Sequence, residues 1–380
     1  MKNCRMLKVL LLTVVLMISG NVVKANPITV NDAMQRAQEF FSSSKARRVK
    51  GNLNLSLAYT MKDASSTSVN GEAALYAFNI GEGNGFVIVS GDDVAVPVLG
   101  YCDTGSFDAE NIPTNVMAWL DGYVEQIQKA RSFEGTEGNQ VFNAAPRKSR
   151  SKIEAMLTSV WNQDEPFNDQ CVFNGTRCLT GCLAAAIGQM MYFWATKGKN
   201  GNTFRAGCKA LEGYTTTTNG YVLDPLPAIG SFDWDNMTDE KPTTAVSKNA
   251  IAQLLRYCGQ ALQANYGQSS TPGSMAKTTN ALKSYFGYNL GISMENEYYY
   301  TPTEWDEMVY AQLAERKPVI LYGEGSNGGH AFICDGYDLD TDTYHMNWGW
   351  GGRYNGWFSM TSLNPENYDL NKKKVCNYQH

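Results

Sequence analysis

The stretch Thr180-Gly181-Cys182-Leu183-Ala184-Ala185-Ala186-Ile187-Gly188-Gln189-Met190-Met191 decides how the rest of this chain is interpreted. After the cysteine, apolar side chains recur at the spacing of one buried helical face: Leu183, Ile187, Met190, Met191 and Trp194. The sequence therefore predicts a helix that begins at Cys182. The N-terminus of a helix carries a partial positive charge, which favours a thiolate and lowers the pKa of a thiol. Cys182 is thus a candidate nucleophile.

A nucleophilic cysteine needs partners, and a later segment supplies the first of them. Acyl transfer requires an imidazole that exchanges a proton with the thiol, and a group that orients this imidazole. Of the three histidines, His380 is the last residue and His345 lies inside a strand pattern, where we expect a packed or surface side chain. His330 instead follows two glycines at the start of an apolar run. We therefore predict that His330 is the general acid and base.

The other catalytic groups are predicted from residues on either side of this pair. Asn347 and Trp348 end the strand pattern that follows His330. An asparagine carbonyl can accept the imidazole N–H, and a tryptophan can shield that bond from water. Gln163, which precedes the nucleophile, can donate to an oxyanion beside the backbone N–H of Cys182. For Trp350, packing in the core is the main alternative to a functional role.

These motifs resemble the streptopain family of secreted bacterial papain-like cysteine proteases. The segments that carry the resemblance are Gly181-Cys182-Leu183-Ala184-Ala185-Ala186, Gly328-Gly329-His330-Ala331-Phe332 with Asp335-Gly336, Asn347-Trp348-Gly349-Trp350-Gly351-Gly352, Trp161-Asn162-Gln163 and Tyr266-Gly267-Gln268-Ser269-Ser270. The resemblance covers roughly residues 150–370. Residues 85–92, through the helix at Val116, also resemble the inhibitory pro-domain of the family.

The resemblance implies a fold and a set of site residues. The fold is α+β: a papain-like catalytic domain preceded by a small α+β pro-domain with an antiparallel sheet. The implied roles are Cys182 as nucleophile, His330 as acid and base, Gln163 at the oxyanion, Asn347 and Trp348 beside His330, and Gly329 with the loop near Pro272 lining the cleft. The implied product is a zymogen that is activated when the pro-domain is removed.

The sequence departs from the family pattern at two places. Leu183 stands where the family has a small β-branched residue, and this change could narrow the cleft or shift the nucleophile. After Leu363 the chain is polar, so we expect an incomplete sheet edge. No histidine precedes residue 330, which excludes inhibition by a pro-domain histidine.

The N-terminal part of the chain predicts three successive regions. Residues 1–25 have a basic start and a short apolar run typical of a secretory signal peptide, and an uncleaved anchor is the alternative. Residues 26–148 are assigned to the pro-domain and activation linker, and residues 149–380 to the catalytic domain. Residues 132–152, ending Pro146-Arg147-Lys148-Ser149-Arg150-Ser151-Lys152, predict an exposed linker open to proteolysis.

Local patterns predict the elements inside these domains. We expect helices over residues 29–41, 250–262 and 274–286, one that follows Thr114 and Asn115, and one that starts at a capping box of Thr303 and Asp306. We expect strands over residues 73–79, 85–90, 94–101, 319–322, 331–337, 344–348 and 357–360. In the catalytic region helices come first and the sheet last, which is typical of an α+β layout.

Composition and charge narrow the functional classes. The 380 residues have a formal net charge of −5 and no basic stripe, so we expect no nucleic-acid partner. Nine cysteines in an exported chain suggest disulfides, and Cys171 could pair with Cys178, or either with Cys208. A zinc site that combines Cys171 and Cys178 with Cys182 lacks the usual tight spacing. The predicted chemistry needs no metal or organic cofactor.

The sequence thus predicts a secreted cysteine endopeptidase made as a zymogen. Its partners would be protein or peptide substrates and its own pro-domain as an intramolecular inhibitor, with no stable membrane insertion after the signal is removed. We expect it outside a bacterial cell, at its surface or in the periplasm. The alternative is a surface binding or adhesion module on a papain-like scaffold that has lost catalysis. Acyl transfer to amines would use the same site.

Overall fold

The structure is a computed structural model that describes residues 26–43, 53–62, 72–132, 149–289, 291–325, 328–363 and 376–379. The predicted signal peptide and residues 133–148 of the predicted linker lie outside the described residues. Among the helices that the structure describes, none combines the length and the apolar character needed to cross a membrane.

Both halves of the chain contain helices and strands. We call them the N-terminal unit (the described part of residues 26–132) and the C-terminal unit (the described part of residues 149–379). The N-terminal unit contains α1 (Val30–Ser42), β1 (Leu55–Lys62), β2 (Ala73–Ile80), β3 (Phe86–Ser90), β4 (Val98–Cys102) and α2 (Thr114–Ser132). The C-terminal unit contains β5 (Val172–Phe173), β6 (Thr176–Arg177), α3 (Cys182–Thr196), β7 (Tyr214–Thr215), β8 (Val222–Leu223), η1 (Trp234–Asn236), α4 (Ala245–Ala261), α5 (Met275–Ser284), β9 (Met294–Asn296), η2 (Glu297–Tyr299), α6 (Pro302–Ala314), β10 (Val319–Gly325), β11 (Gly328–Asp338), β12 (Thr343–Asn347), β13 (Gly356–Phe358) and β14 (Cys376–Gln379).

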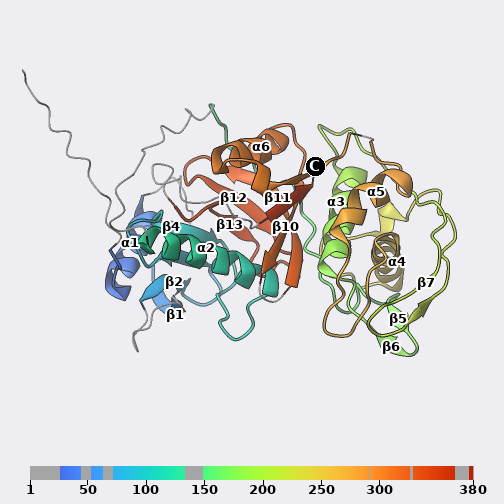
Figure 1. Ribbon diagram of the computed structural model, residues 1–380, viewed down its shortest axis with the longest axis horizontal. Helices are drawn as coiled ribbons and strands as arrows, with labels where there is room; N and C mark the ends of the chain where they lie inside the picture. The colour runs from blue at the N-terminus through green and yellow to red at the C-terminus, as the bar shows by residue number, and fades with distance from the viewer. Residues whose placement is uncertain are drawn as a thin grey trace, which may run out of the picture.

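One antiparallel sheet runs through both units (Figure 1). Within the described residues it has ten strands in the order β1-β2-β3-β4-β13-β12-β11-β10-β14-β9. The units join where β4 pairs with β13, with Tyr101 opposite Trp357 and Gly100 opposite Phe358. A Cβ atom at Gly100 would lie 2.6 Å from the Phe358 ring, so the close approach of these strands requires glycine at this position.

Helices cover the sheet on both faces. The α2 helix buries Val116 and Leu120 in the main core, which continues into the C-terminal unit. The α1 helix buries Ala33 and Phe41 on the outer strands, in a second cluster that also holds Trp357 of β13. Figure 1 shows α3, α4 and α5 grouped beside the sheet rather than over its N-terminal strands. Trp357, a residue of the C-terminal unit, is thus part of the second core cluster, which otherwise belongs to the N-terminal unit.

Most predicted elements are found, but the start of α6 is not where we expected it. The capping box is formed by Thr301 and Glu304, with Pro302 in the first turn. The prediction of a box at Thr303 and Asp306 is therefore wrong. Pro302 suits the first position of a helix because it has no N–H to leave unpaired.

The far edge of the sheet also differs from the prediction. The β14 strand pairs with β10 on one side and with β9 on the other, all antiparallel. The expectation that the edge beyond β10 is incomplete is therefore wrong. The segment was missed because its residues are polar and lack the alternation that marks a half-buried strand.

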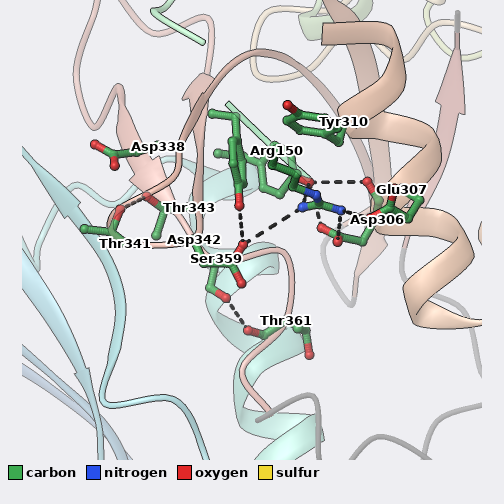
Figure 2. Close-up of polar contacts among 12 residues, drawn as sticks. Arg150, Asp306, Glu307, Tyr310, Asp338, Thr341, Asp342, Thr343, Ser359 and Thr361 are labelled. Carbon is green, nitrogen blue, oxygen red and sulfur yellow. Dashed lines mark hydrogen bonds and ion pairs between the residues drawn. The ribbon is translucent and has the colours of Figure 1, made fainter. Parts of the chain in front are cut away.

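The predicted exposed linker ends earlier than expected, because the side chain of Arg150 is only 3% exposed. Its guanidinium donates to Asp306 at 2.5 Å and to the Tyr344 hydroxyl at 3.0 Å. Figure 2 shows Arg150 beside the two acidic residues of α6, Asp306 and Glu307. The Arg150 guanidinium carbon also lies over the rings of Tyr310 (4.6 Å) and Tyr337 (5.2 Å). These contacts anchor the start of the C-terminal unit.

Charge pairing outweighs desolvation at this anchor. Burial alone would lower the pKa of the Arg150 guanidinium, but Tyr344, Asp306 and Glu307 raise it above its ordinary value. The prediction that proteolysis reaches Arg150 is therefore wrong for the folded chain, since a trypsin-like protease needs an accessible and extensible segment.

We predict that Arg150→Met lowers the free energy of unfolding by about 3–5 kcal/mol, because it leaves the buried Asp306 carboxylate without its cation. The measurement is urea unfolding of the intact chain carrying Cys182→Ala. The matched control is Lys152→Met, since Lys152 pairs with Glu154 on the surface with side chains 50% and 73% exposed. Equal shifts of the urea unfolding midpoint in the two variants would contradict the claim that Arg150 anchors the C-terminal unit.

Candidate active site

The nucleophile candidate lies where the sequence predicts it, at the first residue of α3. Gly181 precedes it with φ of 91°, and a Cβ atom there would lie 2.4 Å from the carbonyl oxygen of Thr271. The N–H of Ala331 in β11 donates to Cys182 Sγ at 3.3 Å. Because Ala331 follows His330 directly, this bond brings the thiol to the strand that carries the histidine.

The charge state of the thiol differs from the prediction. Burial raises the pKa of Cys182 above its ordinary value, although the backbone N–H groups of Ala331 and Leu183 and its own N–H lower it. The N–H groups at the helix start thus favour the thiolate as expected, but in this form of the chain they do not set the net direction of the shift. Cys182 is only partly buried, but desolvation by its surroundings disfavours the charged form of the thiol and here exceeds the effect of the helix end.

The histidine candidate is in contact with the N-terminal unit. His330 Nδ1 lies 3.4 Å from Oγ1 of Thr114, the first residue of α2. By contrast, His345 Nδ1 lies 2.6 Å from Oδ1 of the buried Asp335, and its ring packs on Trp357 at 5.1 Å. His345 is thus a packed histidine, as predicted, and only His330 lies on the strand segment that contacts Cys182.

A buried asparagine of α2 joins the same region. Asn115 is 2% exposed, and its Nδ2 donates to the carbonyl oxygen of Trp348 at 2.8 Å. The Trp350 indole N–H donates to Asn115 Oδ1 at 2.9 Å. These two bonds occupy both ends of the amide, so the first turn of α2 is fixed to the segment that follows β12. Trp350 therefore contacts the N-terminal unit and is not simply core.

Asn347 and Trp348 have well-defined partners in this form. Asn347 Nδ2 donates to the Ser159 carbonyl at 2.8 Å, and its Oδ1 accepts the Gly349 N–H at 3.1 Å. Trp348 is fully buried, with its ring 4.5 Å from Phe332 and 6.1 Å from Trp119 of α2. Their predicted roles beside the imidazole stay predictions.

Gln163 lies near the start of α3. Its carbonyl accepts the N–H of Thr180 at 3.0 Å, two residues before Cys182. The side chain is 4% exposed, and its Nε2 is buried without an acceptor among the described residues. A buried donor left unpaired costs about 1–3 kcal/mol, which an arriving oxyanion would offset. The oxyanion role of Gln163 stays a prediction that this placement supports.

The two predicted cleft residues belong to different segments, β11 and the loop before α5. Gly329 precedes His330, and a Cβ atom there would lie 1.6 Å from the Tyr322 hydroxyl, so only glycine fits. Pro272 lies in the loop before α5. A Cβ atom at the next residue, Gly273, would lie 3.3 Å from the Leu183 side chain. Leu183 is 2% exposed and packs against this loop, and its predicted effect on the cleft stays a prediction.

Three residues of this region were missed in the sequence. Thr114 and Asn115 were interpreted as helix caps, because these residue types are common at helix starts. The sequence analysis assigns no role to Gln189, although it is fully buried and bonded to Asn347. The one signal that could have found it is an amide on a helix whose other faces are apolar.

The sequence matches known families in both units. Residues 161–358 match the Peptidase C10 family, and residues 25–127 match the Spi protease inhibitor. Streptopain from Streptococcus pyogenes is 31% identical over 373 residues, which cover 91% of this chain and 90% of streptopain. The thiol protease/hemagglutinin PrtT of Porphyromonas gingivalis is 28% identical over 90% of this chain and 40% of PrtT.

Solved structures agree with the fold. A prointerpain A fragment from Prevotella intermedia superposes with a TM-score of 0.66 at 24% identity, covering 86% of this chain and 98% of the fragment. Active interpain A from the same organism covers 62% of this chain, with 96% of its own length matched, a TM-score of 0.51 and 25% identity. The predicted α+β fold with a preceding pro-domain is confirmed. The sequence and structural similarities together place the chain in the Peptidase C10, or streptopain, family, as a cysteine protease made as a zymogen.

Proposed function

We propose that this protease is exported and hydrolyses internal peptide bonds through an acyl-enzyme on Cys182. The observation that carries the proposal is the 3.3 Å hydrogen bond from the Ala331 N–H to Cys182 Sγ. It brings the thiol against the strand of His330, whereas the other described histidine, His345, is paired with Asp335. A thiol and an imidazole carried by such neighbouring segments would form the nucleophile and base of acyl transfer.

The proposed reaction has two halves. Cys182 Sγ attacks the scissile carbonyl carbon after its proton moves to His330, and the oxyanion accepts hydrogen bonds from Gln163 Nε2 and the Cys182 backbone N–H. His330 then protonates the amine that leaves. Water, deprotonated by His330, hydrolyses the thioester and regenerates the thiol. Asn347 and Trp348 would orient and shield the imidazole, and Gly329 and Pro272 would line the substrate cleft.

We further propose the boundaries and the inhibitory contact of the zymogen. Residues 1–25 would be the signal peptide, residues 26–148 the pro-domain and linker, and residues 149–380 the catalytic domain. The contact of Thr114 with His330 and the buried amide of Asn115 support inhibition by the first turn of α2. This turn would have to leave before His330 can serve the thiol.

The surroundings in which the enzyme acts are proposed from the sequence. The basic and apolar start of the chain supports export from a bacterial cell, to the surface, the periplasm or the medium. Proteins or peptides are the proposed substrates. The net charge of −5 supports the absence of a nucleic-acid partner.

The first test is casein hydrolysis by the purified chain under mild reducing conditions. We predict that the wild type shortens and gains activity, whereas Cys182→Ala and His330→Ala lose activity by at least about 1,000-fold, the scale seen when a member of a catalytic unit is removed. The controls are Cys258→Ala, a buried thiol on α4, and His345→Asn, which keeps a donor toward Asp335. Inactivity of the wild type after processing would favour a binding module.

The second test concerns the inhibitory contact. We predict that Asn115→Ala speeds the self-processing of the intact chain about 5- to 100-fold, because the buried Trp348 carbonyl loses its partner at about 1–3 kcal/mol. The partly buried Trp350 indole N–H loses its partner as well. The rate is measured by gel electrophoresis at several chain concentrations. The matched control is Asn111→Ala, since the Asn111 side chain bonds to Asp108 within the N-terminal unit. Equal processing rates in the two variants would argue against inhibition through Asn115.

A further inference from the structure

One buried amide links the three segments that carry the proposed catalytic groups. Gln189 lies seven residues after Cys182 in α3, which is two helical turns, so the two side chains share one face of the helix. Its side chain is fully buried. It contacts Trp161, two residues before Gln163, and Asn347 at the end of β12.

The orientation of Gln189 is determined by a backbone group. The N–H of Trp161 can only donate, and it lies 3.1 Å from one side-chain atom of Gln189, which must therefore be Oε1. The amide nitrogen, Nε2, then faces Asn347 Oδ1 at 3.5 Å. Gln189 is thus an acceptor toward the segment of Gln163 and a donor toward Asn347.

The orientation of Asn347 is determined in the same way. The Ser159 carbonyl can only accept, so the atom 2.8 Å from it is Asn347 Nδ2. The Gly349 N–H can only donate, so its partner at 3.1 Å is Oδ1. Asn347 Nδ2 also lies 3.4 Å from Gln189 Oε1. The two amides therefore meet side by side in complementary orientation, with every backbone partner satisfied.

We propose that Gln189 is a positioning residue of the active site, an inference that rests on the proposed function. It does not touch the substrate. It sets the Asn347 carbonyl, which would accept from the imidazole, and the Trp161 segment, which carries the oxyanion donor, at fixed positions relative to Cys182. Since the nucleophile and Gln189 lie on one rigid helix, a single side chain aligns the three groups.

This role differs from that of an ordinary buried amide, and the chain offers a matched control. Gln260 on α4 is 2% exposed, and its Nε2 donates to the carbonyls of Glu212 and Asp224 at 3.0 Å each. Replacing either glutamine by methionine keeps the length of the side chain and removes buried hydrogen bonds. Both variants should lower thermal stability, but only Gln189→Met should disturb the active site.

The activity experiment compares Gln189→Met and Gln260→Met after both chains have been processed by trypsin. We expect kcat of Gln189→Met to fall about 10- to 100-fold with KM changed less than about threefold, because a small misplacement of reacting groups lowers the rate more than binding. Gln260→Met should keep the kcat of the wild type. Gln189→Glu, which retains an acceptor for the Trp161 N–H, should recover part of the loss.

A double-mutant cycle then asks whether Gln189 acts through Asn347. If it does, the fold-loss of kcat in the double variant Gln189→Met, Asn347→Ala should be smaller than the product of the fold-losses in the two single variants. Additive effects would overturn the coupling. So would equal losses of kcat for Gln189→Met and Gln260→Met, since this result assigns Gln189 a role in stability alone.

A readout that needs no turnover separates this inference from the proposed function. The rate at which iodoacetamide alkylates Cys182 is measured against pH on the processed chains. Gln189→Met should move the midpoint to higher pH than Gln260→Met, because a poorly oriented imidazolium stabilises the thiolate less. If every chain were inactive, the proposed hydrolysis would fail while the alkylation midpoints still decided on Gln189. Unchanged midpoints would overturn the inference.

Discussion

The pairing of β4 with β13 is the constraint on which the rest of the zymogen depends. Gly100 and Tyr101 of the pro-domain lie opposite Phe358 and Trp357 of the catalytic domain, and this pairing makes one sheet of two. No side chain larger than that of glycine fits at residue 100, because a Cβ atom would meet the Phe358 ring at 2.6 Å. The domain orientation is therefore determined by backbone hydrogen bonds and not only by surface contacts.

That orientation brings the first turn of α2 to the active site. Thr114 Oγ1 lies 3.4 Å from His330 Nδ1, and Asn115 is bonded to Trp348 and Trp350 in the segment after β12. In this form of the chain, desolvation also raises the pKa of the Cys182 thiol. Inhibition in this zymogen would then act on the imidazole and on the charge of the thiol together.

Local patterns in the sequence predicted much of the fold and the main candidates for the catalytic residues. The helix at Cys182 follows from the spacing of Leu183, Ile187 and Met190, and the strand at His330 from a glycine pair before an apolar run. These signals are short-range, so one sequence is sufficient to recognise them. The family resemblance added the cleft residues Gly329 and Pro272, which spacing alone would not have indicated.

What the sequence could not predict depends on contacts between distant segments. Tyr101 and Trp357 are paired although 256 positions separate them in the sequence. The residue pattern of a strand does not indicate which distant strand it pairs with. Thr114 and Asn115 resemble ordinary helix caps in the sequence. Arg150 resembles the basic residues of the linker before it, and only the fold shows that it pairs with Asp306 and Glu307 of α6. The raised pKa of Cys182 likewise comes from tertiary burial, which opposes the local effect of the helix N-terminus.

The most direct test of this zymogen is the pH dependence of Cys182 alkylation before and after the pro-domain is removed. Short pulses of iodoacetamide are applied, the intact and processed bands are separated, and the Cys182 peptide is quantified by mass spectrometry. In the intact chain the alkylation rate should rise only at a pH above 9.0, the ordinary pKa of a thiol, since desolvation raises the pKa of Cys182. In the processed chain it should already be high near pH 6, as for a thiolate paired with an imidazolium at about pKa 3–4. The same pH profile in both forms would contradict control of the thiol by the pro-domain.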